Sequence, residues 1–219
     1  MRPRLGGVSE APARTFEVRH VQLGRALFAA VAAIMITFSA DHSAEVGLAV
    51  FSGWAIATAL VLLIGAGLAH PRGGRAAPVL VGVLTLVAGM IGGLPGIRST
   101  TLFFAVVVVW ALAAGVAELA FGIHGRRRGV PEARDGVLVG AVTMALGIGL
   151  LVVNPAYRLD YVIDEAGSFT LSGIAIGVGI FGGYAAIVAV FLGIAGFSPR
   201  AASPASVALP TDRPVGESV

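Results

Sequence analysis

The chain has 219 residues, of which 57% are hydrophobic and only 12% are charged, and its formal net charge is +3. Soluble domains carry about 25% charged residues, so this composition excludes an ordinary soluble domain and indicates an integral membrane protein. Cysteine is absent, which excludes disulfide frameworks, thiolate metal sites and cysteine nucleophiles.

Residues 1–20 combine proline, glycine and scattered charges without helical periodicity, which predicts a disordered cytoplasmic leader. The first apolar span follows at about 21–40. A secretory signal peptide is the alternative interpretation, because Phe38 is followed by the small residues Ser39 and Ala40. The apolar stretch is about 20 residues long, against 7 to 15 in a signal core, and this length favours a helix of the mature protein.

Five further apolar stretches approach the length of a membrane-spanning helix, which needs about 20 residues to cross a hydrocarbon core of about 30 Å. They cover about 46–69, 76–93, 100–123, 136–153 and 171–197. The longest link joins the fifth span to the sixth, and residues 198–219, rich in Ser, Pro and Ala, predict a disordered cytoplasmic tail. The predicted fold class is therefore all-α, a polytopic membrane protein with six transmembrane helices.

The arginines indicate how these spans are oriented. All fifteen Lys and Arg residues are arginines, and with both termini in the cytoplasm only Arg98 and Arg158 fall outside, which leaves thirteen inside. This is the bias that the positive-inside rule describes. We therefore expect a multi-pass protein of a bacterial plasma (inner) membrane, with both termini cytoplasmic. The basic charge reflects topology, so the lipid bilayer is the expected partner and nucleic acid is not.

Short similarities between the spans indicate an internal repeat. The segment WAIATALVLL from Trp54 aligns with WALAAGVAEL from Trp110, with a fainter third copy at Tyr184. The third and fifth spans share a Val-Gly pair followed by Thr85 or Thr143. These matches predict three helical hairpins in the same orientation, related by an axis along the membrane normal. Chance coincidence among Ala, Val, Leu and Gly in apolar sequence is the alternative.

Each of the later hairpins has a glycine-bearing span, a proline turn and a second apolar span. The motif runs from Gly89 to Pro95, then through Glu118 to the basic stop at Arg126, and again from Gly147 to Pro155. Over roughly residues 21–197 this pattern resembles the HdeD family of six-span bacterial membrane proteins of the acid-resistance type, although the first hairpin lacks the turn proline. The resemblance implies a non-enzymatic role in acid or envelope stress, without catalytic residues or cofactors.

Glu118 is the only charge inside the fourth span and the candidate intramembrane functional residue. A carboxylate within the bilayer is costly and faces the bundle interior. It lies eight residues before Arg126, about 12 Å along a helix, so it is expected in the inner leaflet. One interpretation ties it to a neighbouring helix or to Arg126 and Arg127. The other gives it a role in a small transporter or channel for protons or a small solute.

A second candidate is an external acid-sensing cluster on the outer side. Its members are Asp41, His42, Glu45, Asp160, Asp164 and Glu165. Such groups change charge as pH falls and can bias a two-state element, but solvated acids in loops depleted of positive charge are the simpler interpretation. One histidine beside acids lacks the geometry of a metal site, and no Ser, His and Asp arrangement indicates catalysis, so neither a metal nor an enzyme is expected.

Glycine pairs spaced by four residues predict close helix packing in lipid. The pairs are Gly89 with Gly93, Gly136 with Gly140, Gly173 with Gly177, and Gly179 with Gly183. The same glycine-lined helices could join a second copy of the chain or another membrane protein. Trp54, Trp110 and Tyr184 stand at equivalent repeat positions, which favours packing between hairpins over a substrate site.

Overall fold

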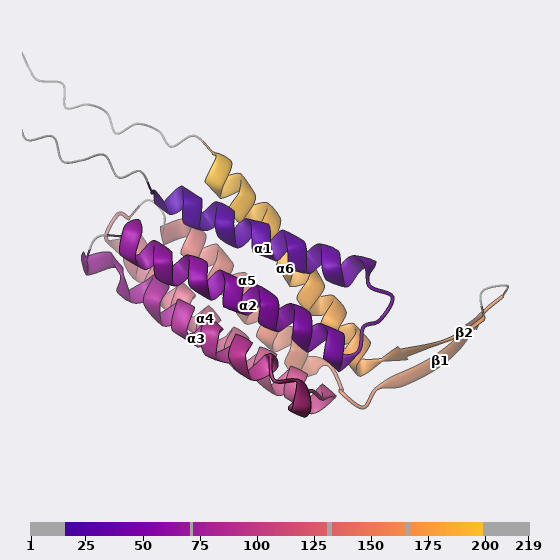
Figure 1. Ribbon diagram of the computed structural model, residues 1–219. Coiled ribbons are helices and arrows are strands. Elements are labelled where there is room, and N and C mark those ends of the chain that lie inside the picture. The colour runs from indigo at the N-terminus through magenta and orange to yellow at the C-terminus, as the bar shows by residue number, and fades with distance from the viewer. Residues whose placement is uncertain (1–15, 71, 131–132, 165–166, 199–219) are drawn as a thin grey trace, which may run out of the picture.

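The computed structural model describes residues 16–70, 72–130, 133–164 and 167–198, and these form a helical bundle (Figure 1). The described helices are α1 (Val18–Phe38), α2 (Ala44–Leu68), α3 (Ala76–Gly92), α4 (Thr100–Arg127), α5 (Ala133–Val152) and α6 (Gly173–Phe197), with the short 3-10 turns η1 (Arg72–Gly74) and η2 (Pro95–Ile97). Most of the predicted leader and nearly all of the predicted tail lie outside the described residues.

Helix ends differ from the predicted span ends, and the differences have one cause. Helix α1 begins at Val18, within the predicted leader, and α4 continues to Arg127, four residues past the predicted span. The apolar stretch marks where lipid contact would stop, whereas a helix continues as long as its backbone hydrogen bonds are made. Composition therefore located the apolar part of each helix better than its ends.

Helices α1, α2, α4, α5 and α6 are long and apolar enough to cross a membrane. Helix α3 has 17 residues, which at 1.5 Å per residue give about 26 Å against a hydrocarbon core of about 30 Å. Among the described residues, five helices thus have membrane length, and the third predicted span corresponds to the shorter α3. The all-helical, polytopic character of the bundle agrees with the prediction.

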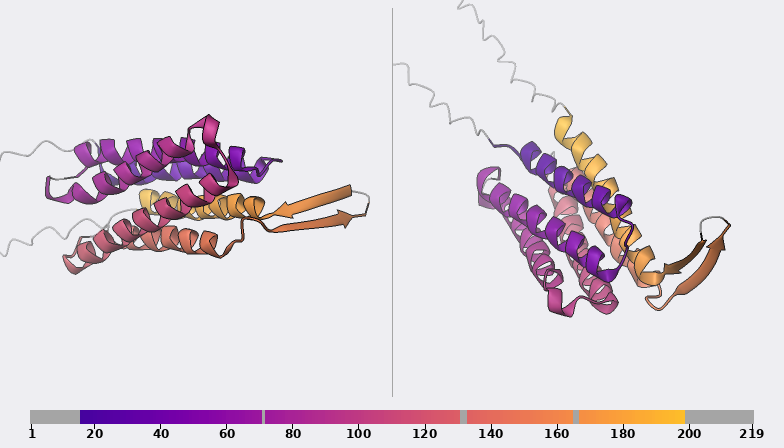
Figure 2. Two further views of the ribbon diagram at one scale, coloured as in Figure 1. Left: turned by 90° about the horizontal axis from the view of Figure 1, so that it is seen from below. Right: turned by 45° about the vertical axis from the view of Figure 1, so that its right-hand side comes forward.

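The helices pack as a closed ring. Helix α2 packs along α3, α4 along α5, and the first helix, α1, along the last, α6, while the other consecutive helices also touch. Helices α2, α4 and α6 additionally meet one another, α2 contacting both. Figures 1 and 2 show the described chain ends and the α2–α3 and α4–α5 links at one end of the bundle, which we call the arginine end. The opposite end is the hairpin end.

The link between α5 and α6 is a β-hairpin, which the sequence analysis described only as the longest link. Strands β1 (Arg158–Ile163) and β2 (Gly167–Ser172) are antiparallel, with Tyr161 opposite Phe169. Figure 2 shows the hairpin projecting beyond the bundle. It takes up the first two residues of the predicted sixth span, because the branched and aromatic residues there favour strands. Gly167, the first residue of β2, adopts a φ of 98°, which favours glycine.

Serine caps begin three helices at the hairpin end. The hydroxyls of Ser43, Ser99 and Ser172 accept hydrogen bonds from backbone N–H groups in the first turns of α2, α4 and α6. A serine at this position satisfies a backbone donor that the helix itself cannot pair. The three helices that meet inside the bundle therefore start in the same way and at the same end.

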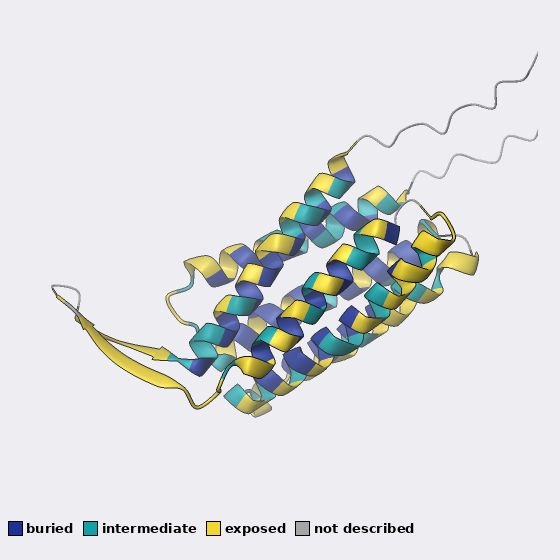
Figure 3. Cartoon of the chain, turned by 180° about the vertical axis from the view of Figure 1, so that it is seen from behind, coloured by how far each residue is buried: buried dark blue, intermediate teal, exposed yellow. Residues whose placement is uncertain are grey.

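Burial follows the inner faces of the helices (Figure 3), and the outer faces carry many large apolar side chains. Exposed side chains on the outside include Leu27, Ile64, Met90, Val109 and Val190. A bundle surrounded by water would place polar residues there, because large exposed apolar patches on soluble monomers are rare. The outer surface is therefore suited to lipid.

Three of the predicted glycine pairs contribute to packing within the chain, and one does not. An added Cβ on Gly140 would lie 2.5 Å from the backbone nitrogen of Leu119, and one on Gly89 would lie 3.1 Å from that of Ile56. Gly177 faces the rings of Phe103 and Phe104. By contrast, Gly179 and Gly183 have no atom within 4 Å of such a Cβ, so the expected close packing of this pair does not occur within the described chain.

Candidate functional site

A largely apolar pocket of about 660 Å³ opens at the arginine end. All six helices contribute to it, with His70, Gly73 and Arg128 near its mouth. Its deeper wall is mostly apolar, with Val21, Leu62, Val81, Val139 and Leu192. Besides His70 and Arg128, the polar side chains that line it are Gln22, Arg25, Glu118, His124 and Asp135. We call this cavity the arginine-end pocket.

Glu118 forms an ion pair with Arg25 in the wall of this pocket. The Nη2 atom of Arg25 donates to Oε1 of Glu118 at 2.7 Å, and the side chains are only 15% and 10% exposed. The pair joins α1 to α4 across 93 positions of sequence. The sequence suggested either a neighbouring helix or Arg126 and Arg127 as the partner of Glu118. The structure shows the neighbouring helix, and Arg126 and Arg127 are exposed at the end of α4. The buried carboxylate is therefore neutralised inside the bundle.

A second long-range contact lies one turn closer to the arginine end. The side-chain amide of Gln22 donates to Oδ2 of Asp135 at 2.5 Å, which joins α1 to the first turn of α5. Gln22 is buried, and its Oε1 atom has no hydrogen-bond partner among the described residues. The Nε atom of Arg25 is likewise buried without a partner there. Two polar side chains in the pocket wall thus retain unused hydrogen-bonding capacity.

An aromatic cluster fills the centre of the bundle beyond the pocket. Trp54, Trp110 and Tyr184 come from α2, α4 and α6, and their ring centroids are 5.1 to 6.1 Å apart, with near-perpendicular rings. Phe51 and Phe181 pack against them. None of these five rings lines the pocket. The cluster therefore separates the arginine-end pocket from the hairpin end, and its aromatic packing agrees with the role expected for Trp54, Trp110 and Tyr184.

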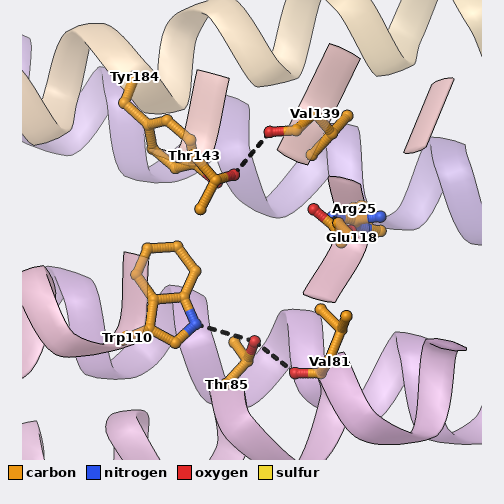
Figure 4. A network of polar contacts seen from close by, with 8 residues as sticks. All are labelled: Arg25, Val81, Thr85, Trp110, Glu118, Val139, Thr143 and Tyr184. Carbon is orange, nitrogen blue, oxygen red and sulfur yellow. Dashed lines mark hydrogen bonds and ion pairs between the residues drawn. The ribbon is translucent and has the colours of Figure 1, made fainter. Parts of the chain in front are cut away.

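Two threonines link this cluster to the surrounding helices (Figure 4). The Oγ1 atom of Thr85 donates to the carbonyl of Val81 and accepts from Nε1 of Trp110 at 3.0 Å. Thr143 donates to the carbonyl of Val139, and its hydroxyl lies 3.0 Å from that of Tyr184. The residues that the sequence aligned between the third and fifth spans thus make matching contacts.

Glu118 stands where the matching helices carry leucine. It follows Trp110 by eight residues, as Leu62 follows Trp54 and Leu192 follows Tyr184. All three residues line the pocket, and both leucines are buried. An otherwise apolar layer is therefore interrupted once, by Glu118, and Figure 4 shows Arg25 beside it.

The predicted acid-sensing residues fall into two separate places at the hairpin end. Asp41 accepts hydrogen bonds from the backbone and hydroxyl of Ser43 in the α1–α2 link, and His42 and Glu45 flank it. Asp160 accepts from Thr170 within the β-hairpin, where Asp164 follows β1. Glu165 lies outside the described residues. Within the part of the chain that the structure describes, no three His, Cys, Asp or Glu side chains gather as a metal site would require.

Gln22, Arg25 and Asp135 were missed as site residues at the sequence level. Arg25 is one of the thirteen arginines that the positive-inside rule places on the cytoplasmic side, and topology alone explains an arginine near the end of a span. One signal was present, since Gln22 and Arg25 are three residues apart and share a helix face. The sequence also offered a buried partner, Glu118, but it did not indicate that the first span lies beside the fourth.

Comparisons of the chain with family models, with curated proteins and with solved structures found no match. The resemblance to HdeD-like proteins accordingly stays a prediction that depends on the motifs quoted above.

Proposed function

We propose that the chain is a six-span protein of a bacterial plasma membrane, built from three hairpins, with the arginine end in the cytoplasm. The arginine-rich links and both described chain ends lie together, as the positive-inside rule requires. The short α3 packs along α2 within the bundle, and local thinning of the bilayer or its flanking residues can accommodate a short helix. Labelling of single cysteines at Arg126 and Arg98 would test this topology, with Arg126 expected inside and Arg98 outside.

We further propose a non-enzymatic role in tolerance of acid or envelope stress. The observation that carries it is the buried Arg25–Glu118 pair, which joins two helices at the end facing the cytoplasm. Loss of either partner would leave the other charge unpaired, and an unpaired buried charge destabilises the packing around it. The packing of the bundle therefore depends on this pair, and the resemblance to acid-resistance proteins supports a role in stress.

A deletion strain provides the test. Loss of survival at low pH, restored by the wild-type gene but not by Glu118→Gln, is the expected result, because glutamine keeps the shape and removes the charge. Asp160→Asn is the control, since among the described residues its carboxylate makes only a local contact, with Thr170 in the β-hairpin. If Glu118→Gln restores survival fully, the role of the ion pair is refuted; if Asp160→Asn fails instead, the external acid-sensing cluster takes its place.

Transport of protons or a small solute past Glu118 is the second candidate. The arginine-end pocket favours it, because the pocket gives Glu118 access from one side. The aromatic cluster opposes it, because it blocks the continuation towards the hairpin end. Proton flux into liposomes that contain the purified protein distinguishes the two: flux that Glu118→Gln abolishes supports transport, and survival loss without flux supports the stress role.

A further inference from the structure

We propose that the β-hairpin lies on the membrane surface beside the bundle, with one of its two faces in contact with phospholipid in the zone of the headgroups. The inference rests on the bundle spanning a membrane. It goes beyond the proposed role in stress and does not depend on that role.

The register of the two strands gives the hairpin one apolar face. Side chains alternate between the two faces of a strand, and residues directly opposite each other in an antiparallel pair share a face. Leu159 lies opposite Leu171, and Tyr161 lies opposite Phe169. The rings of Tyr161 and Phe169 stack with their centroids 5.9 Å apart, as residues on one face do. We call the surface made by these four side chains the apolar face.

The other face of the hairpin is mostly polar. Asp160 lies opposite Thr170, and its carboxylate accepts a hydrogen bond from the Thr170 hydroxyl. Arg158 lies on the same face two residues earlier, and Val162 lies opposite Ser168. An antiparallel sheet with one apolar and one polar face is typical of a boundary between an apolar phase and water.

The described chain leaves the apolar face uncovered. The side chains of its four residues are 37% to 48% exposed, and the sheet packs mainly on the start of α6, through β2. A two-stranded hairpin alone is at best marginally stable in water, and a sheet gains stability when its hydrophobic face packs against something. The hairpin therefore needs a further apolar surface.

The base of the hairpin holds it to one side of the bundle, where lipid would lie. The N–H group of Gly173 donates to the carbonyl of Tyr157 at 2.8 Å, and a Cβ on Gly173 would clash with the carbonyl oxygen of Asn154. Figure 1 and the right-hand view of Figure 2 show the hairpin turned aside from the line of α6. The exposed Leu151 and Val152 at the end of α5 continue the apolar outer surface of the bundle up to this base.

The free strand edges indicate how deep the hairpin lies. The sheet has only two strands among the described residues, so each strand has one unpaired edge. The backbone groups on that edge need water or headgroups as partners, because hydrocarbon offers none. Tyrosine is enriched at the membrane–water interface, since its ring is apolar and its hydroxyl is polar. Tyr161 within the apolar face therefore suits the headgroup zone.

Lipid fits the apolar face better than a second copy of the chain paired at a strand edge. Edge pairing would extend the sheet and leave the apolar face uncovered. The charges indicate which lipid contact to expect. The described hairpin carries Arg158 against Asp160 and Asp164, so it lacks the cluster of basic residues that recognises anionic lipids. The contact therefore depends on apolar area, and a zwitterionic lipid suffices.

Spin labels at single cysteines test the inference on the full chain in phosphatidylcholine nanodiscs, because the chain contains no cysteine of its own. Phe169→Cys and Ser168→Cys are neighbours on opposite faces. Oxygen concentrates in lipid, whereas a nickel chelate stays in water. We expect the ratio of oxygen accessibility to nickel accessibility to be several-fold higher at position 169 than at position 168.

A second pair repeats the comparison on β1 and keeps the contact between the rings of Tyr161 and Phe169. Leu159→Cys and Val162→Cys both replace an exposed aliphatic side chain, and only Leu159 is on the apolar face, so the higher ratio is expected there. The labels report lipid contact on either side of the membrane, so the result does not depend on the topology.

Two results would overturn the proposal. Equal nickel accessibility on both faces would show that the hairpin lies in water. Protection of the apolar face from both reagents, with dipolar coupling between labels of two chains, would assign that face to a second copy of the chain.

Discussion

The three odd-numbered helices are attached to the bundle interior in two different ways. Helices α3 and α5 each use a threonine, Thr85 or Thr143, to bond an aromatic side chain of the next helix. Among the described residues, helix α1 makes no such bond to α2, and Nε1 of Trp54 is buried without a partner. Instead, α1 extends Arg25 to Glu118 of α4.

The first hairpin thus differs from the other two in the kind of interaction that attaches its first helix. A neutral hydrogen bond between consecutive helices stabilises the packing and leaves the interior apolar. An ion pair between helices of different hairpins places charge in an apolar layer, which brings net stability only with good geometry and complete pairing. The first helix is therefore the one whose attachment depends on charge, and the polar residues of the pocket gather around it.

The largest loss of stability is expected when one partner of the ion pair is removed. Glu118→Leu or Arg25→Leu should each destabilise the bundle by about 3–5 kcal/mol, because the remaining charge is buried and unpaired. The double variant should recover most of this loss, since leucine occupies the matching positions Leu62 and Leu192. Unfolding in detergent mixtures, followed by circular dichroism, measures all three. Additive losses in the double variant would show that the two residues do not act as a pair.

The neutral attachments should be weaker. Thr85→Val or Thr143→Val should destabilise by about 1–3 kcal/mol, because the buried donor of Trp110 or the hydroxyl of Tyr184 loses its partner. Thr58→Val is the matched control, since the Thr58 hydroxyl is buried without a partner among the described residues, and its removal should be neutral or stabilising. The same unfolding assay applies, and a loss at Thr58 equal to that at Thr85 would contradict the assignment.

A smaller difference should separate the two tryptophans. Both are equally buried in the same cluster, but only Trp110 donates a hydrogen bond to a described residue. Trp110→Phe should therefore cost about 1 kcal/mol more than Trp54→Phe, the usual net contribution of one hydrogen bond. Thermal unfolding in detergent compares them directly. Equal losses would mean that the Thr85 bond contributes nothing measurable to the stability of the third helix.

The smallest effect on the folded monomer is expected at the open face of α6. Gly179→Ala should change stability by less than about 0.5 kcal/mol, as surface substitutions usually do, because a Cβ there meets no atom within 4 Å. Gly140→Ala is the contrasting variant, since its Cβ would meet the backbone of Leu119. If Gly179→Ala weakens chemical crosslinking between copies without destabilising the monomer, the open glycine face joins a homo-oligomer.

Local sequence patterns determined much of the architecture. The lengths of the apolar stretches predicted the positions of six helices, because a helix that contacts lipid or a protein core must be apolar along that contact. The positions of the arginines predicted that the α2–α3 and α4–α5 links lie on the same side of the membrane. The repeated Trp54 and Trp110 predicted packing within the bundle, and the lone charge of its span predicted that Glu118 faces the bundle interior. Each of these inferences depends on residues close together in sequence or on composition alone.

Tertiary structure alone decided which helix meets which. Helix α1 packs against α6, Arg25 reaches Glu118, and Gln22 reaches Asp135 from positions 113 apart in sequence. Periodicity shows that a helix has an inner face but contains no information on the order of helices around the bundle axis. That order follows from the closure of the whole ring, in which every inner face must be covered at once, and it places the charges of distant segments in a single pocket.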